Sequence, residues 1–169
     1  MSQVDHSKML RNVSIASVVG ATIEWYDFFL YGVVAGIVFN KLYFPTSDPY
    51  LGTIMAYSTF AIGYLARPLG GFIFGHYGDK LGRKRMLILT MLIMGIATVG
   101  IGLVPTYASI GIAAPILLLL MRVMQGAAIG GEMPGAWVFV AEHAPAKRYG
   151  FAIGALTSGI TGGIFLGSI

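Results

Sequence analysis

The 169-residue chain carries far less charge than a soluble domain of its size. Charged residues make up 11% and hydrophobic residues 56% of the sequence, whereas soluble domains carry about 25% charged residues. With a mean hydropathy of +0.78, the chain falls in the membrane class. The formal net charge of +4 does not indicate nucleic-acid binding, because the basic residues flank apolar stretches and no aromatic-rich basic groove accompanies them. The absence of cysteine excludes disulfides, thiolate metal sites and cysteine nucleophiles.

Five apolar stretches follow an amino-terminal tail of residues 1–11. They cover residues 12–40, 51–75, 86–105, 112–141 and 149–169. Each reaches the ~20 residues that a helix needs to cross a bilayer, and only short connectors with turn formers separate them. The first stretch is too long for the apolar core of a signal peptide, so we expect it to be retained. The sequence predicts an all-α integral membrane protein with about five spans.

Lysine and arginine predict which side of the membrane each connector faces. The residues flanking one side are Lys8, Arg11, Lys80, Arg83, Lys84, Arg85, Lys147 and Arg148. Lys41 alone flanks the other side, and Arg67 and Arg122 lie inside spans. By the positive-inside rule, the amino terminus and the connector at residues 75–85 are cytoplasmic. The alternative, a water-soluble helical bundle, would need polar outer faces that these helices lack.

Two carboxylates lie near the middle of the first predicted span. Glu24 and Asp27 are three residues apart and share one face of a helix. A charge at the bilayer centre costs at least ~2.5–3.5 kcal/mol, so an ionisable residue there is a functional candidate. Two close carboxylates resist being ionised together, which raises the proton affinity of one. Tyr31, one turn beyond Asp27, can donate a hydrogen bond. The pair predicts a proton or substrate site; alternatively, the acids pair with an arginine only to fix helix packing.

Arg67 is the charged residue inside the second predicted span. It precedes Pro68, which removes a backbone donor and tends to kink a helix. A kink beside a charge indicates the wall of a cavity. Three interpretations stay open: Arg67 binds an anionic substrate, neutralises the acids of the first span, or extends towards the cytoplasmic face.

The fourth predicted span places Arg122, Gln125 and Glu132 on one broad side of a helix. Packing alone does not require charge at this depth, so we predict that these residues line a polar site. Glycine pairs four residues apart allow helices to approach closely. The pairs are Gly32 and Gly36, Gly71 and Gly75, Gly126 and Gly130, and Gly159 and Gly163.

The sequence gives little support to an enzyme. His6, His76 and His143 all lie in the tail or in the predicted cytoplasmic connectors, which leaves carboxylates as the proton carriers within the membrane. There is no Gly-x-Ser-x-Gly elbow, no phosphate-binding loop and no His-Glu-x-x-His zinc helix. We therefore expect no enzymatic activity, no metal and no cofactor.

Several motifs, in order along the chain, resemble the major facilitator superfamily. The segment from Gly75 to Arg85 resembles the cytoplasmic loop between the second and third helices, with Lys80 in place of the commoner arginine. The stretch Arg122-Val123-Met124-Gln125-Gly126 is similar to the Arg-x-x-Gln-Gly element of the fourth helix. Residues 24–28, 66–71 and 130–132 narrow the resemblance to the metabolite:proton symporters, which include permeases for shikimate, α-ketoglutarate, citrate and proline/betaine.

The resemblance implies a fold and a set of roles. The chain would form most of the amino-terminal six-helix bundle, with the first and fourth helices lining a central cavity. Asp79 would dock on the carboxy-terminal half and hold the cytoplasmic side closed, and Arg83 would pair with Glu142. The remaining residues of this gate loop are Gly75, Lys80, Gly82 and Lys84. The fifth span lacks the Gly-Pro element of antiporters, which favours symport. The segment 131–135 departs from the Gly-Glu-Trp-Gly-Gly common among these symporters, so the substrate of a named member is not carried over.

These observations predict a secondary active transporter of the bacterial-type inner membrane, with a cytoplasmic amino terminus. We expect proton-coupled symport of a small organic anion or zwitterionic metabolite. Asp27 or Glu24 would take up the proton, and Arg67 or Arg122 would attract a carboxylate. Such transporters are built from two six-helix halves, so the expected partners are the missing carboxy-terminal half and the lipid bilayer, without nucleic acid. The alternatives are an inactive remnant or fragment, and a membrane assembly subunit without transport activity of its own.

Overall fold

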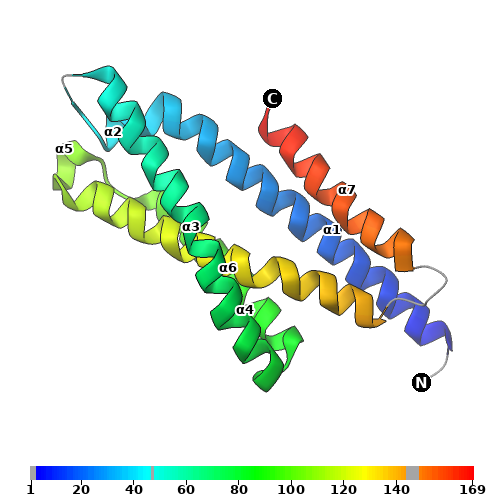
Figure 1. Ribbon diagram of the computed structural model, residues 1–169. Coiled ribbons are helices and arrows are strands. Elements are labelled where there is room, and N and C mark those ends of the chain that lie inside the picture. The colour runs from blue at the N-terminus through cyan, green and yellow to red at the C-terminus, as the bar shows by residue number, and fades with distance from the viewer. Residues whose placement is uncertain (1–2, 47, 144–148) are drawn as a thin grey trace. The chain divides into compact units, whose positions relative to one another are not determined.

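A computed structural model describes residues 3–46, 48–143 and 149–169, and within these ranges the chain forms helices and no strand (Figure 1). Side chains are described except at residues 3–14, 16, 17, 84, 136 and 139–143. The elements are α1 (Gln3–Val34), a π-helical turn η1 (Ala35–Phe39), α2 (Asn40–Leu42), α3 (Pro49–Leu81), α4 (Arg83–Leu103), α5 (Tyr107–Ile110), α6 (Ala113–His143) and α7 (Tyr149–Gly167). The prediction of an all-α fold is confirmed.

Four of the described helical segments are long and apolar enough to cross a membrane. They are Val18–Leu42, Arg85–Leu103, Ala113–Gly135 and Tyr149–Gly167. They coincide with four of the five predicted spans. The other predicted span, residues 51–75, is helical within α3, which has 33 residues. It is absent from the four because glycines, tyrosines and Arg67 lower its mean hydropathy.

The boundaries of α3 follow from residues that favour helix ends. Asp48 is the N-cap, and its carboxylate accepts a hydrogen bond of 2.9 Å from the backbone N–H of Tyr50. Pro49 occupies the first turn, where its missing N–H costs nothing. Pro68 lies inside α3 and Pro134 lies inside α6, and both helices are continuous through the proline. Pro68 thus removes one backbone donor without ending α3, and the kink expected beside Arg67 stays a prediction.

The chain divides into two compact units. The first contains residues 1–30 and 134–169, and the second contains residues 31–133. Each unit is described separately below.

In the first unit, α7 runs beside α1, and glycines on α7 allow the two backbones to approach closely (Figure 1). A Cβ atom at Gly159 would lie 2.7 Å from the carbonyl oxygen of Val18, and one at Gly167 would lie 2.9 Å from that of Tyr26. Gly163 meets the backbone of Thr22 in the same way. The Thr22 hydroxyl also lies 3.0 Å from the carbonyl oxygen of Gly159, to which it donates. Small residues therefore form this helix contact, as expected for packing inside a membrane.

In the second unit, α3 crosses α6 with backbone against backbone (Figure 1). A Cβ atom at Gly70 would overlap the backbone of Ala127, and one at Gly126 would overlap the backbone of Gly63. The prediction that Gly126 and Gly130 pack against another helix is confirmed, since Gly130 faces the backbone of Arg67. No side chain larger than hydrogen can occupy these positions while the helices remain this close.

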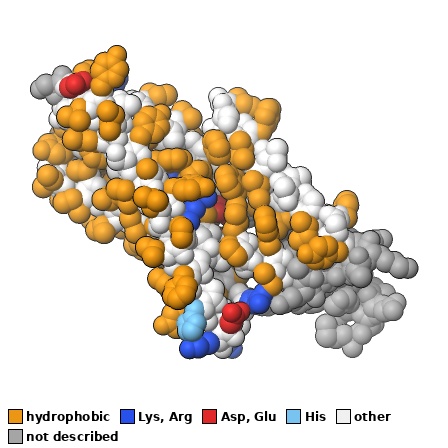
Figure 2. All heavy atoms as spheres, in the orientation of Figure 1, with side chains coloured by type: hydrophobic (Ala, Val, Ile, Leu, Met, Phe, Trp, Pro, Cys, Tyr) orange, Lys and Arg blue, Asp and Glu red, His pale blue; other side chains and the backbone are white. Residues whose placement is uncertain are grey.

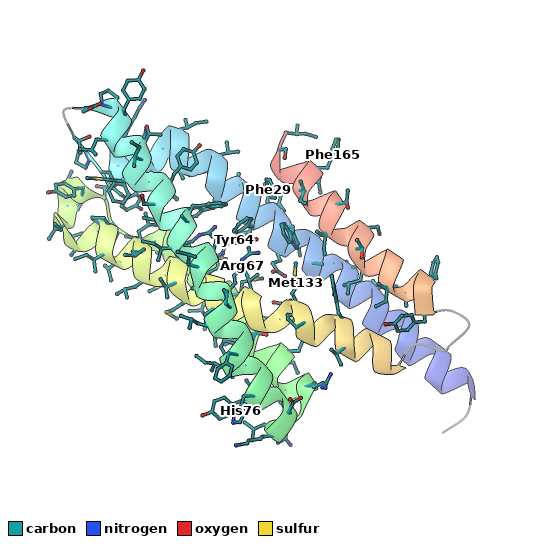
Figure 3. The ribbon with its side chains drawn as sticks, in the orientation of Figure 1. Phe29, Tyr64, Arg67, His76, Met133 and Phe165 are labelled. Atoms are coloured by element: carbon teal, nitrogen blue, oxygen red, sulfur yellow. The ribbon has the colours of Figure 1, made fainter. Side chains whose placement is uncertain are left out.

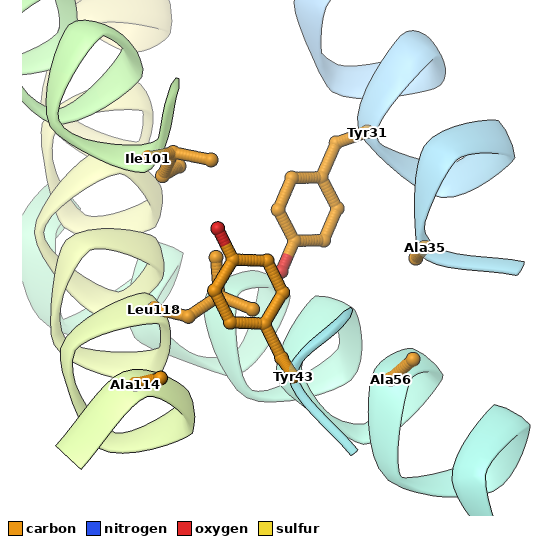
Figure 4. Close-up of a cluster of buried hydrophobic side chains, with 7 residues drawn as sticks. All are labelled: Tyr31, Ala35, Tyr43, Ala56, Ile101, Ala114 and Leu118. Atoms are coloured by element: carbon orange, nitrogen blue, oxygen red, sulfur yellow. The ribbon is translucent and has the colours of Figure 1, made fainter. Parts of the chain in front are cut away.

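A buried apolar cluster lies at one end of the second unit (Figure 4). Its members are Tyr31, Ala35, Tyr43, Ala56, Ile101, Ala114 and Leu118. The π-helical turn η1 inserts one extra residue per turn at Ala35–Phe39, and Phe39 packs edge to face with the rings of both Tyr31 and Tyr43. The Tyr43 hydroxyl donates a 2.8 Å hydrogen bond to the carbonyl oxygen of Val104, which ties the end of α4 to the segment after α2.

The connector predicted at residues 75–85 is almost entirely helical. Helix α3 continues to Leu81 and α4 begins at Arg83, so the break is confined to Gly82, whose φ is 96°. Glycine adopts this backbone conformation without the steric cost that other residues incur. The predicted loop was too long. The residues from 75 onward are more polar, which suggested that the helix ended there, but its backbone hydrogen bonds continue to Leu81.

Apolar side chains cover most of the face seen in Figure 2, and charged and histidine side chains gather at one end of it. That end contains His76, labelled in Figure 3 near the end of α3. The same region contains Asp79 and Arg83, whose exposed ion pair measures 3.5 Å. A few charged side chains also lie in the middle of this face and at its opposite end, within a surface that is otherwise apolar, as expected for helices that contact lipid.

Candidate functional site

The second unit contains a buried arginine held by polar and aromatic groups. Arg122 on α6 is 1% exposed. Its Nη1 donates a hydrogen bond to Oε1 of Gln125, one turn along the same helix. The Nε2 of Gln125 then donates to the hydroxyl of Thr98 on α4, at 2.9 Å. A chain of hydrogen bonds therefore connects the guanidinium group to a neighbouring helix.

Two aromatic rings contact the same guanidinium group. The Cζ of Arg122 lies 3.8 Å from the centroid of the Tyr31 ring and 5.2 Å from that of Phe60. The two rings are themselves stacked, with centroids 6.2 Å apart. A desolvated cation over an aromatic face gains about 2 kcal/mol or more. The rings thus offset part of the cost of burying this charge.

The orientation of Tyr31 is set by a threonine of α3. The Tyr31 and Thr59 hydroxyl oxygens are 2.7 Å apart, and the Thr59 hydroxyl donates its proton to the carbonyl oxygen of Ala56, also at 2.7 Å. Because a threonine hydroxyl has one proton, the Tyr31 hydroxyl is the donor to Thr59. Tyr31 therefore has a fixed ring position beneath Arg122.

Gly63 provides the space that Arg122 occupies. A Cβ atom at Gly63 would lie 2.7 Å from Cγ of Arg122 and 3.1 Å from its Nε. These separations are shorter than van der Waals contact, so the arginine side chain lies directly across the backbone of α3. The absence of a side chain at Gly63 therefore allows Arg122 to adopt its buried position.

Arg67 and Glu132 lie elsewhere in the second unit. Arg67 is half-buried, and its Cζ lies 4.7 Å from the centroid of the Tyr64 ring, one turn earlier on α3 (Figure 3). Glu132 on α6 is 6% exposed. No hydrogen bond or ion pair joins its carboxylate to any other residue of the described part of the chain. The structure thus brings together three predicted site residues, Tyr31, Arg122 and Gln125.

Glu24 and Asp27 belong to the first unit. Glu24 is 3% exposed and Asp27 is half-buried, and their spacing places both on one side of α1. Aromatic rings surround this part of the helix: Trp25 lies 5.8 Å from Phe28 and 6.2 Å from Phe29, centroid to centroid. The prediction that these two acids share one cavity with the arginines of the second unit stays a prediction.

Sequence reasoning missed Thr59, Phe60 and Thr98. Threonine and phenylalanine are common in apolar helices, where a threonine hydroxyl usually bonds to the carbonyl of its own preceding turn. No feature of the sequence distinguishes Thr98 from other such threonines, so only the packing of α4 against α6 identifies it. In the predicted gate loop, Asp79 pairs with Arg83, whereas Lys84 and Glu142 have side chains outside the described part.

Comparison with known proteins identifies the family. Residues 13–169 match the family model described as "Sugar (and other) transporter". The chain belongs to this family of the major facilitator superfamily. No solved structure matches.

Relatives of this family member include several named bacterial transporters. It is 49% identical to the shikimate transporter of Escherichia coli over 92% of its own length and 36% of the relative. It is 46% identical to the proline/betaine transporter of Salmonella typhimurium over 98% of its length and 33% of the relative. An inner membrane metabolite transport protein of Escherichia coli is 48% identical over 80% of the chain and 31% of the relative.

The family member spans about a third of the length of these curated relatives. Its apolar helices and its family together make it a multi-pass membrane protein of transporter type. The buried Arg122 cluster is therefore a polar site inside a membrane protein, where a charge is expected to have a functional role.

The substitution Thr98→Val is expected to destabilise the second unit by about 1–3 kcal/mol, because the buried amide of Gln125 loses its hydrogen-bond acceptor. Thr98→Ser keeps the hydroxyl and should restore most of that loss. The midpoint of SDS-induced unfolding, followed by circular dichroism, measures the effect.

Thr157→Val is the matched control for Thr98→Val. The Thr157 hydroxyl is exposed and donates to the carbonyl oxygen of Ile153 in its own helix, at 3.0 Å. Its loss should change stability by no more than about 0.5 kcal/mol. Equal shifts for the two valine variants would show that the Thr98 to Gln125 bond does not stabilise the cluster.

Proposed function

We propose that the chain forms part of a proton-coupled symporter for a small organic acid or similar metabolite in the inner membrane. The observation that supports this best is the fully buried Arg122, held by Gln125 and Tyr31 inside apolar helices. Such a group is costly in a membrane and is retained where an anion or a proton must be handled. The names of the relatives, which include shikimate and proline/betaine transporters, support the same class of substrate.

The two arginines differ in how accessible they are to a substrate. The guanidinium of Arg122 is covered by the rings of Tyr31 and Phe60. Arg67 is half-buried and therefore more accessible to an arriving carboxylate. We propose that Arg67 makes the first contact with an anionic substrate, and that Arg122 supplies positive potential from within the bundle.

Proton uptake is assigned to the carboxylates of α1. Glu24 and Asp27 are three residues apart on one face of α1, a spacing at which the charge of one would raise the proton affinity of the other. Because Asp27 is half-buried and Glu24 is almost wholly buried, Asp27 is the group that exchanges protons with water more readily. Protonation would neutralise this face of α1 and allow the loaded bundle to move.

The polar end of α3 and α4 is proposed to act on the cytoplasmic side. Its basic residues support this side by the positive-inside rule, which assigns the amino terminus to the same side. The solvent-accessible pair of Asp79 and Arg83 joins the last turn of α3 to the first residue of α4 across Gly82. In a complete transporter, Asp79 would contact the second half of the molecule, which is the expected protein partner.

A chimera tests the proposed function. The chain would replace the matching segment of the Escherichia coli shikimate transporter, to which it is 49% identical. Cells that express the chimera should accumulate a radiolabelled carboxylate or betaine, and a protonophore should abolish accumulation. Cells that express the 169-residue chain alone show whether it accumulates substrate without the remaining segment of the transporter. A chimera that reaches the membrane in normal amounts but transports none of a panel of carboxylates and betaines would favour an inactive remnant or an assembly subunit.

Asp27→Asn in the active chimera is expected to abolish proton-driven accumulation, because an amide cannot take up and release a proton at this position. Downhill exchange of substrate across the membrane should continue. The comparison of accumulation with exchange in membrane vesicles measures the effect. Asp48→Asn, at the exposed N-cap of α3, is the control and should leave both activities unchanged. Accumulation by Asp27→Asn at the wild-type rate would remove Asp27 from the mechanism.

A further inference from the structure

Three aromatic side chains form a row between Arg122 and the end of α4. The centroid of the Tyr31 ring lies 3.8 Å from Cζ of Arg122. Phe39 packs edge to face with Tyr31 at 5.1 Å and with Tyr43 at 5.3 Å, centroid to centroid. The Tyr43 hydroxyl then donates to the carbonyl oxygen of Val104, the residue that follows α4. All five residues belong to the second unit, so the row is a continuous path of contacts within it.

The π-helical turn η1 places the rings of this aromatic row on one face. Tyr31 and Tyr43 are twelve positions apart, and in an uninterrupted α-helix their side chains would point about 120° away from each other. The turn at Ala35–Phe39 accommodates one extra residue, which removes about 100° of this rotation and leaves about 20°. Both tyrosines therefore reach the same buried cluster (Figure 4). The π turn makes the row continuous.

Tyr43 holds the segment that follows α4. The last carbonyl groups of a helix lack donors within the helix, and Pro105, which follows Val104, has no N–H to continue it. The bond from Tyr43 thus satisfies a carbonyl group at this end. The next amides with local hydrogen bonds are those of residues 109–111, which donate to carbonyl oxygens of the preceding turn. The Tyr43 bond therefore ties this segment to α2 and η1.

The aromatic row is densely packed, so a displacement at one end is passed along it. Tyr31 and Tyr43 are each 5% exposed, and Phe39 packs against the same cluster. A Cβ atom at Gly36, inside the π turn, would lie 2.7 Å from the hydroxyl oxygen of Tyr57, so η1 also packs closely against α3. Interiors of this density have low compressibility and transmit shifts between neighbouring side chains.

We propose that the aromatic row couples Arg122 to the end of α4. An anionic group that pulls the guanidinium away from Tyr31 then weakens the bond from Tyr43 to Val104 and loosens residues 104–111. Coupling of this kind is reciprocal, so release of the segment also favours a guanidinium that is free to bind an anion. The anion as ligand rests on the proposed function, whereas the coupling rests on the contacts of the row. Occupancy at Arg122 would thus reach the end of α4 that is opposite Arg83.

Amide hydrogen exchange tests the coupling on the complete chain in lipid nanodiscs, with mass spectrometry as the readout. Tyr43→Phe keeps the ring and removes the hydrogen bond, so exchange at residues 109–111 should rise about three- to tenfold. Tyr50→Phe is the control, because the Tyr50 ring is 81% exposed, and exchange at residues 109–111 should not change. Wild-type exchange in Tyr43→Phe would overturn the proposal.

Arg122→Lys should raise exchange at residues 109–111 at least about twofold, although the substitution lies on another helix. The amides of Arg85 and Met86, which donate to the carbonyl oxygen of Gly82 at the other end of α4, are the internal control. Their exchange should not respond. An equal rise at both ends of α4 would indicate general loosening of the second unit and would contradict the coupling.

Phe39→Leu interrupts the aromatic row at its centre. In this background, Arg122→Lys should no longer change exchange at residues 109–111, because the two ends have lost their connection. Phe44→Leu is the matched control: Phe44 packs against the same cluster but is not one of the three rings, so the response to Arg122→Lys should persist. A response that survives Phe39→Leu would show that the row does not carry the coupling.

The exchange assay requires no transport, so its outcome is separate from that of the chimera. An inactive chimera together with the expected exchange pattern contradicts the proposed function alone. An active chimera, together with exchange at residues 109–111 that does not respond to Arg122→Lys, contradicts this inference alone.

Discussion

Alanine at Gly70 is expected to prevent α3 and α6 from packing at their observed distance. The new Cβ atom would overlap the backbone of Ala127, including its carbonyl oxygen. If the overlapped atoms belonged to a side chain, that side chain could rotate away. They belong to the backbone of α6, which can move only with the whole helix. Overpacking usually costs about 1–3 kcal/mol, and we expect a cost of at least about 3 kcal/mol here. Separation of the helices would also disturb Arg122, which lies across Gly63 two turns earlier on α3.

Gly75→Ala is the matched control for Gly70→Ala. It makes the same chemical change in the same helix, but nothing lies within 4 Å of a Cβ atom at this position. The exchange should be neutral or stabilising, because alanine favours a helix over glycine by up to about 1 kcal/mol. The SDS concentration at the unfolding midpoint, with helicity followed by circular dichroism, compares the two variants. Equal midpoints would show that the close approach of α3 and α6 does not limit stability.

Arg122→Lys is expected to destabilise the second unit by about 2–4 kcal/mol and to reduce uptake by the chimera to under about a tenth. Lysine keeps the charge but loses the planar group that stacks on Tyr31 while donating to Gln125. The estimate combines the loss of a desolvated cation–π contact, about 2 kcal/mol, with that of a charged hydrogen bond, about 1.5–3 kcal/mol. Partial relaxation of the lysine lowers the sum.

Arg85→Lys provides the comparison for this substitution. Arg85 is exposed in the first turn of α4, and exposed charges of this kind contribute little to stability. Its exchange should change the unfolding midpoint by no more than about 0.5 kcal/mol. If the two lysine variants unfold at the same SDS concentration and the chimera with Arg122→Lys transports normally, then the shape of the Arg122 guanidinium has no role.

The sequence was sufficient to locate the long helices, because long stretches rich in apolar residues and separated by short connectors favour helices in a bilayer. It was less accurate where a helix extends beyond that layer. Residues 75–81 continue α3 although they are polar, since helical hydrogen bonding does not end at the membrane surface. The break at Gly82 could be anticipated only as one of several glycines in this segment.

Only the charged and strongly polar members of the Arg122 cluster could be predicted from the sequence. Arg122 and Gln125 were identified because a charge in an apolar helix is unusual, and they do lie in one cluster with Tyr31. Thr59, Phe60 and Thr98 were not identified, because neutral residues of these types carry no such signal. Their roles depend on which helices meet, and that information lies in the packing.

The contact between Gly63 and Arg122 links two positions that are far apart in the sequence. Since a Cβ atom at position 63 would lie 2.7 Å from Cγ of Arg122, any residue larger than glycine there forces the arginine side chain out of its observed position. A larger residue at position 63 alone would overpack this contact, and a smaller residue at position 122 alone would leave a void. Arg122 on α6 therefore constrains which residues are tolerated at position 63 of α3. Substitutions at the two positions are expected to be coupled in their effect on stability.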